Sequence, residues 1–146
     1  TNMKEVEDIG VIGVLEDHGA MELAMALRGA AERGIKSHEF TFRGEQGEMY
    51  AVGGAIEIIS GVHEIWLKIL DYENVRRLRK TFLIACQEAL DSYATDVDAR
   101  RLQCTAEARD TRSNTFLVAL GFIPEGFMLN YGKGGVDHIR YARIYE

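Results

Sequence analysis

The uneven placement of glycine is the feature that most limits how this chain can fold. All fifteen glycines lie outside the block from Val62 to Leu120, and so does the single proline, Pro124. Because glycine and proline are the residues that most often interrupt helices and strands, this block is expected to hold a strand and a long helix. It cannot hold a phosphate-binding loop built from glycines.

The size and charge of the chain limit the functions that it can have. Its 146 residues and 16.4 kDa suit one core, so residues 1–146 are predicted to form a single domain. Apolar residues make up 47% and charged residues 27%, which excludes a disordered tail and a disulfide-stapled miniprotein. The net charge of −6 at pH 7 argues against a broad nucleic-acid-binding surface.

Several segments bear on the environment of the protein. The longest apolar stretches, such as Ala51–Ile59, are too short to cross a bilayer, and the first residues lack the hydrophobic core of a secretion signal. Cys86 and Cys104 lie in periodic segments and are predicted to be buried, reduced thiols. A cytoplasmic protein is therefore expected. No metal site is predicted, because the histidines are scattered without ligand spacing.

The clearest predicted element is a long helix from Tyr72 to Tyr93. Its apolar residues recur mostly at spacings of three and four, which is typical of a helix with one buried face. These residues are Val75, Leu78, Phe82, Cys86, Ala89, Leu90 and Tyr93. Asp71 or Asn74 can cap its start, because short polar side chains accept hydrogen bonds from free backbone amides there.

The remaining elements follow from alternation, apolar runs and turn residues. Strands are predicted at Val11–Leu15, His38–Arg43, Glu48–Ile59, His63–Leu70, Arg101–Ala106, Phe122–Tyr131 and Asp137–Tyr145, and helices at Ala20–Arg33 and Thr111–Leu120. The pair Gly53-Gly54 indicates either a bulge or a close backbone approach. A strand–helix–strand crossover beside hairpins predicts an α/β fold, with a mixed, mostly antiparallel sheet flanked by helices.

This order of elements and three sequence stretches resemble the GNAT superfamily of N-acetyltransferases. Residues Phe116–Gly126 contain "LGF", two residues and "EG", as at the family's junction between its last helix and the sixth strand. Glu64–Leu67 resembles the family's fourth strand, and Gly135–Arg143 resembles its closing strand. The combination looks closest to acetyltransferase-like proteins of tailed phages, of the internal virion protein type.

The resemblance implies a single GNAT-like domain and one of two functions. The first is transfer of an acetyl group from acetyl-CoA to the amine of a small molecule or peptide. The second is a non-catalytic phage virion or host-interacting protein that keeps the scaffold, binds a protein partner and has lost the cofactor loop.

The resemblance also implies where acetyl-CoA would bind. The family holds the pyrophosphate with Arg/Gln-x-x-Gly-x-Gly/Ala, but the matching stretch, Asp71–Lys80, contains no glycine. Its basic residues would take over that role, unless they form only a solvated basic face; they are Arg76, Arg77, Arg79 and Lys80. The main chain of Leu67 and Ile69 would contact pantetheine.

Acetyl transfer to an amine needs a base that removes the ammonium proton. Glu64 resembles the glutamate that many members of the family use, and His63 beside it is a second candidate. The alternative is that both are ordinary groups at the end of a strand.

The usual acid for the leaving thiolate is missing. Where the family has a tyrosine, this chain has Leu117, and Asp110 replaces the usual asparagine. Tyr131 and Tyr141 are the candidates to replace that tyrosine, although nothing in the sequence places either of them near the thiolate.

Overall fold

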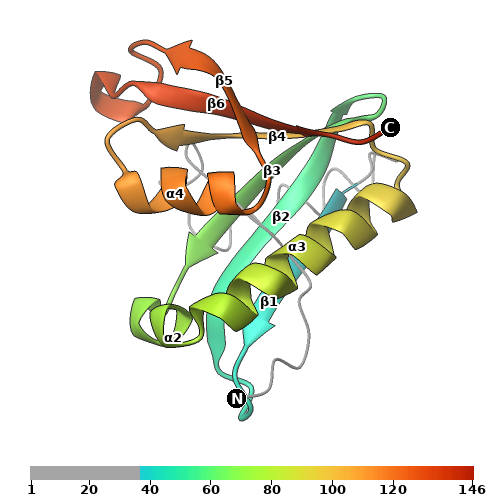
Figure 1. The fold of residues 1–146 in the computed structure, drawn as a ribbon, viewed down its shortest axis with the longest axis vertical. Helices are drawn as coiled ribbons and strands as arrows, with labels where there is room; N and C mark the ends of the chain where they lie inside the picture. Colours follow the sequence, from blue (N-terminus) through green and yellow to red (C-terminus); the bar gives the residue numbers. More distant parts are fainter. Residues whose placement is uncertain (1–36) are drawn as a thin grey trace.

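A computed structural model describes residues 37–146, which form one six-stranded sheet with helices packed on it (Figure 1). The predicted strand Val11–Leu15 and helix Ala20–Arg33 lie outside the described residues. In chain order the elements are β1 (Ser37–Arg43), β2 (Met49–Ile59), β3 (Val62–Ile69), α2 (Tyr72–Arg77), α3 (Arg79–Asp96), β4 (Arg101–Glu107), α4 (Thr111–Ala119), β5 (Ile123–Met128), the short 3-10 helix η2 (Lys133–Gly135) and β6 (His138–Ile144).

The sheet is mixed, with the strand order β1-β2-β3-β4-β6-β5. Strands β1, β2 and β3 form an antiparallel meander, and β4, β6 and β5 pair antiparallel to one another. Among the strands of residues 37–146, the single parallel pair is β3 with β4, and α2 and α3 make the crossover between them. The predicted α/β class, mostly antiparallel pairing and crossover are all confirmed.

Helices α3 and α4 pack on the same face of the sheet, which we call the helix face (Figure 1). On β6, Tyr141 donates a hydrogen bond to Asn114 of α4, and Arg143 pairs with Asp91 of α3 at 3.0 Å. Residues two apart on a strand project to the same side, so both helices cover that side. Arg140 directly precedes Tyr141 on β6 and therefore projects to the opposite face.

The core lies between the helix face and α3. The predicted stripe of α3 is buried at Phe82, Cys86, Leu90 and Tyr93, and Phe82 meets Phe42 of β1 edge-on at a ring-centroid distance of 4.6 Å. Both cysteines are buried and free, as the sequence predicts, and burial raises the pKa of the Cys86 and Cys104 thiols. They are therefore protonated, inert core residues.

The predicted helix from Tyr72 to Tyr93 is divided at Leu78, so its continuity was wrongly predicted. The backbone of Leu78 has φ −102° and ψ 24°, outside the α-helical region, and α3 changes direction after it (Figure 1). Apolar periodicity continues across the break because Leu78 still packs against the core. A period of three and four therefore does not reveal a break at a partly buried residue that keeps its contact with the core.

The C-terminal hairpin is shorter than predicted. Strand β5 ends at Met128 instead of reaching Tyr131, because Asn130 has φ 57° and its N–H donates to Asp137 Oδ1 at 2.8 Å. A residue in the left-handed region cannot continue a strand.

Among the described helices, none is long and apolar enough to span a membrane.

Gly54 lies where a tryptophan side chain approaches the backbone. The β1–β2 and β2–β3 registers run without a shift through this glycine, so the close-approach alternative holds and the bulge does not. A Cβ on Gly54 would overlap the ring of Trp66, its cross-strand neighbour, which is buried.

Gly54→Ala is therefore expected to lower the free energy of unfolding by about 1–3 kcal/mol, because a packed ring would have to move. In an unobstructed strand the same change stabilises, by roughly 0.5–1 kcal/mol. Urea denaturation of Gly54→Ala, with and without Trp66→Leu, measures the effect. The loss should largely vanish in the Trp66→Leu background, and an equal loss in both backgrounds would contradict the proposed overlap.

Candidate functional site

Strands β3 and β4 pair along only the first part of their length and then separate. They pair only at Val62–Arg101, His63–Leu102 and Glu64–Gln103, although β3 continues to Ile69 and β4 to Glu107. Figure 1 shows the two strands diverging from that point. The sheet therefore opens in a V between β3 and β4, with Glu64 at its apex.

The backbone of β3 is unpaired along one side of this V. Leu70 N–H donates to Tyr50 O of β2 at 2.8 Å. The backbone N–H and C=O groups of the even-numbered residues of β3 therefore point toward β2. Just before the start of β3, Arg101 N–H of β4 donates to Gly61 O. The backbone groups of the odd-numbered residues therefore point toward β4. Leu67 and Ile69 thus turn their N–H and C=O groups into the V, where no described strand pairs with them.

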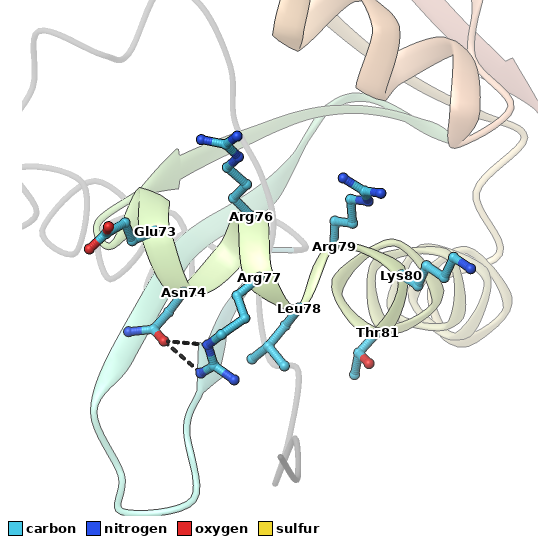
Figure 2. Close-up of a pocket in the computed structure, with 8 residues that line it drawn as sticks. All are labelled: Glu73, Asn74, Arg76, Arg77, Leu78, Arg79, Lys80 and Thr81. Atoms are coloured by element: carbon cyan, nitrogen blue, oxygen red, sulfur yellow. Dashed lines mark hydrogen bonds between the residues drawn. The ribbon is translucent and has the colours of Figure 1, made fainter.

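The basic residues gather where the V opens, at the junction of α2 and α3. They line a hollow of about 840 Å³ together with their neighbours on both helices (Figure 2). Arg76 and Arg79 point to the same side of the junction, and Lys80 points outward from α3. These three side chains are exposed and have no hydrogen-bond or ion-pair partner within residues 37–146.

Arg77 differs from the other three predicted phosphate contacts. Its Nη2 and Nε donate to Asn74 Oδ1 at 2.6 and 3.3 Å, and the side chain points away from Arg76 and Arg79 (Figure 2). Asn74 in turn donates to Asp71, which caps α2 and whose pKa is lowered by these hydrogen bonds. The structure therefore groups Arg76, Arg79 and Lys80, and places Arg77 with the cap of α2.

Within the first turn of α3, no acidic side chain or capping group compensates the positive charge. Its N-cap, Leu78, offers no side-chain acceptor, and its first turn contains no acidic residue but does contain Arg79 and Lys80. The N-terminus of a helix is the positive end of its dipole, where cationic side chains are unfavourable and anions bind well. This helix start is arranged to accept an anion.

Glu64 is held firmly at the apex of the V. Its Oε1 accepts hydrogen bonds from Gln103 Nε2 at 2.9 Å and from Arg140 Nη1 at 3.2 Å. The amide of Gln103 is fixed in turn, because its Oε1 accepts from Arg101 Nε at 2.8 Å. The carboxylate remains 30% exposed and has lone pairs left for a further donor.

His63 lies on the other face of the sheet. It is fully buried on the helix face, with Nδ1 2.7 Å from Tyr93 Oη and Nε2 3.8 Å from a carboxylate oxygen of Glu57. Adjacent residues of a strand project to opposite sides, so His63 and Glu64 do not share one site. Burial raises the pKa of Tyr93, so its hydroxyl keeps its proton.

The residues considered for the leaving-group acid are also placed. Leu117 is buried in the core, and Asp110 caps α4 by accepting from Ser113 N–H at 3.2 Å. Tyr141 is buried under α4 with its hydroxyl on Asn114, and burial raises its pKa. Tyr131 is exposed and packs edge-on against His138.

Sequence reasoning missed several residues around the V. Gln103 and Arg140 reach Glu64 from β4 and β6, and the guanidinium of Arg112 in α4 lies 4.9 Å from the centre of the Tyr72 ring in α2. Nothing local marks these residues, since each contact depends on the strand register or on the placement of α4. The alternation of residues on β4 and β6 predicts on which face of the sheet Gln103 and Arg140 lie, but it does not predict that both contact Glu64.

Comparison with known proteins identifies the fold. No protein-family model and no curated protein sequence matches the chain. A ribosomal-protein-S5-alanine acetyltransferase from Vibrio fischeri matches in structure with a TM-score of 0.68 and 17% identity, over 84% of this chain and 69% of that one. Spermidine N-acetyltransferase from Vibrio cholerae, solved with CoA and spermine, matches with a TM-score of 0.68 and 17% identity, over 87% and 76%.

A putative acetyltransferase from Acinetobacter baylyi gives a TM-score of 0.69 at 13% identity, over 88% of this chain and 73% of that one. The chain therefore has the GNAT acetyltransferase fold, as the sequence resemblance predicted.

Proposed function

We propose that the protein transfers an acetyl group from acetyl-CoA to an amine. The observation that carries this proposal is the arrangement along β3 and the helix after it. A carboxylate stands at the apex of the V, unpaired backbone follows along one side, and an uncapped, cationic helix start lies at its mouth. Thioester, pantetheine and diphosphate are joined in the same order in acetyl-CoA.

The residues present fit acetyl-CoA without a glycine loop. Arg76, Arg79 and Lys80 would hold the diphosphate together with the positive end of α3, because charged donors replace the backbone amides of the usual loop. The backbone of Leu67 and Ile69 would bind pantetheine. Arg77 is left out of this set, since its guanidinium is bonded to Asn74.

In the proposed reaction, acetyl-CoA supplies the acetyl group as a thioester. Glu64 removes a proton from the acceptor ammonium, directly or through water, because a carboxylate fixed by Gln103 and Arg140 keeps a lone pair for it. The amine nitrogen then bonds to the acetyl carbon as the carbon–sulfur bond breaks, and the CoA sulfur leaves with a proton as the thiol. His63, buried on the other face, supports the position of β3.

A non-catalytic scaffold is the weaker explanation. Such a protein would need neither an accessible carboxylate at the apex nor three exposed cations at an uncapped helix start. The resemblance to internal virion proteins of phages stays a prediction from the sequence. The proposed acetyl transfer does not depend on it.

The proposal is tested by calorimetric titration with acetyl-CoA and with CoA. The Arg76→Ala/Arg79→Ala double variant is expected to weaken acetyl-CoA binding about 10- to 100-fold, because it removes two charge-assisted contacts to phosphate. Arg77→Ala is the matched control from the same hollow and should change the Kd less than about threefold. Absence of heat and of any thermal shift at millimolar ligand would overturn the proposed function.

A further inference from the structure

A balanced network of charges covers the face of the sheet opposite the helices, around Glu64. Arg140 of β6 binds Glu64, Gln103 joins Glu64 to Arg101, and Arg101 forms a two-point ion pair with Glu125 of β5. Arg101, and less strongly Arg140, hold the pKa of Glu125 below its usual range. Two cations and two carboxylates thus compensate one another at the apex of the V.

Arg140 uses only part of its guanidinium in this network. Its Nη1 lies 3.2 Å from Glu64 Oε1 and 3.4 Å from Oε2, so a single nitrogen serves both oxygens. Nε and Nη2 have no partner within residues 37–146. The side chain is 23% exposed, so these donors are within reach of a bound molecule.

The unused donors of Arg140 lie directly beside the proposed base. An acceptor whose amine reaches Glu64 therefore places its nearest substituents against Arg140. A planar guanidinium binds a carboxylate through two parallel N–H groups, which is the strongest pairing that this group makes. A hydrocarbon substituent there would leave the donors unpaired in a half-buried position.

We propose that the acceptor is a zwitterion, an amino acid whose carboxylate lies within one or two carbons of the amine. Glu64 receives the ammonium group and Arg140 receives the carboxylate. This inference rests on the proposed acetyl transfer and names its acceptor class. The products are the N-acetylated amino acid and CoA thiol, with one proton released to solvent.

A polyamine fits the same groups less well. Its several ammonium charges need carboxylates without competing cations, whereas Glu64 is paired with Arg140 and Glu125 with Arg101. A second ammonium group close to Glu64 would meet the charge of Arg140 at short range, which is repulsive. Polyamines are therefore the acceptors that the described network disfavours.

The experiment follows CoA thiol release from acetyl-CoA with the standard L-amino acids, their α-amides and spermidine as acceptors. Calorimetry with acetyl-CoA comes first, so that the two proposals are separated. For the best acceptor, the amino acid should exceed its own amide in kcat/KM by at least about tenfold, because the amide lacks the anion that Arg140 binds.

Arg140→Gln should remove this preference. The kcat/KM of the amino acid should fall at least about tenfold more than that of its amide, because loss of the Arg140–Glu64 contact affects both acceptors and only the acid also loses its anion contact. Arg140→Lys keeps a point charge and should recover part of the loss. The matched control is Arg143→Gln, on the same strand at 24% exposure but paired with Asp91 on the helix face, which should keep the preference.

The outcomes distinguish the two proposals. If acetyl-CoA does not bind, the acetyltransferase proposal fails and the zwitterion inference fails with it. If acetyl-CoA binds but amide and acid react equally, or spermidine is the best acceptor, only the zwitterion inference is overturned. Should Arg140→Gln not fold, the comparison of acid with amide in the parent protein and in Arg140→Lys still tests the zwitterion inference.

Discussion

Glu64→Gln is expected to lower kcat for acetyl transfer about 10²- to 10³-fold and to leave the Kd for acetyl-CoA within about twofold. Glutamine has the shape of glutamate, and its amide oxygen can still accept from Gln103 and Arg140. It cannot take a proton from an ammonium group. The variant therefore removes the proposed base and leaves the opening between β3 and β4 intact.

The pH dependence makes this prediction sharper. Without a base, only acceptor molecules that are already neutral react, and their share rises with pH toward the pKa of the free amine, which is roughly 8–10. The rate of Glu64→Gln relative to the parent should therefore be lower at pH 7 than at pH 9. Thiol release measured at both pH values with saturating acetyl-CoA provides the test.

The chain offers a close control for this carboxylate. Glu107 lies at the end of β4 on the same sheet face, has the same 30% exposure as Glu64, and pairs with Arg109 at 3.5 Å. Glu107→Gln should keep kcat within about twofold, because the network around Glu64 does not include it. A Glu64→Gln variant with parental kcat at both pH values would remove Glu64 from the mechanism.

Much of the fold could be predicted from local patterns. Alternation on β1 predicts that Phe40 and Phe42 share a face, and both are buried in the core. The spacing from Val75 to Tyr93 predicts which side of the helix faces the sheet. These are properties of one element at a time, and side-chain periodicity follows directly from backbone geometry.

The candidate site could be predicted only in part, because it is made between elements. The sequence identifies Glu64 and the basic residues near α3. It does not distinguish Arg76, which points to the same side as Arg79, from Arg77, which is bonded to Asn74. It also cannot find Arg140, which meets Glu64 across an intervening strand, 76 positions along the chain. Both depend on packing and register that no local pattern contains.

The absence of glycine before α3 changes meaning once the structure is considered. The sequence suggests a lost cofactor loop, since bulky residues limit how closely a ligand approaches the backbone. In the structure those residues form the short helix α2, and the cations beside the uncapped start of α3 remain exposed. The loss of glycine therefore changes which groups would hold a phosphate, from backbone amides to side chains.

Because one side of β3 is unpaired in the V, proline is expected to have different effects on stability at neighbouring positions of this strand. Lys68→Pro removes an N–H that faces β2 and should destabilise the protein by about 3 kcal/mol, because its carbonyl partner on β2 is left unsatisfied. Leu67→Pro removes an N–H that faces the V. Proline is tolerated in strands where the lost N–H has no partner, so this variant should retain most of the stability.

The same Leu67→Pro variant should bind acetyl-CoA about tenfold more weakly, since it deletes one backbone donor to the ligand. Leu67→Ala separates the backbone effect from the loss of the side chain, because it keeps the N–H and should bind within about threefold of the parent. Thermal unfolding and calorimetry of the three variants give both readouts. Equal destabilisation by proline at positions 67 and 68 would show that β3 is paired on both sides, and the proposed pantetheine contact would then have no free backbone to use.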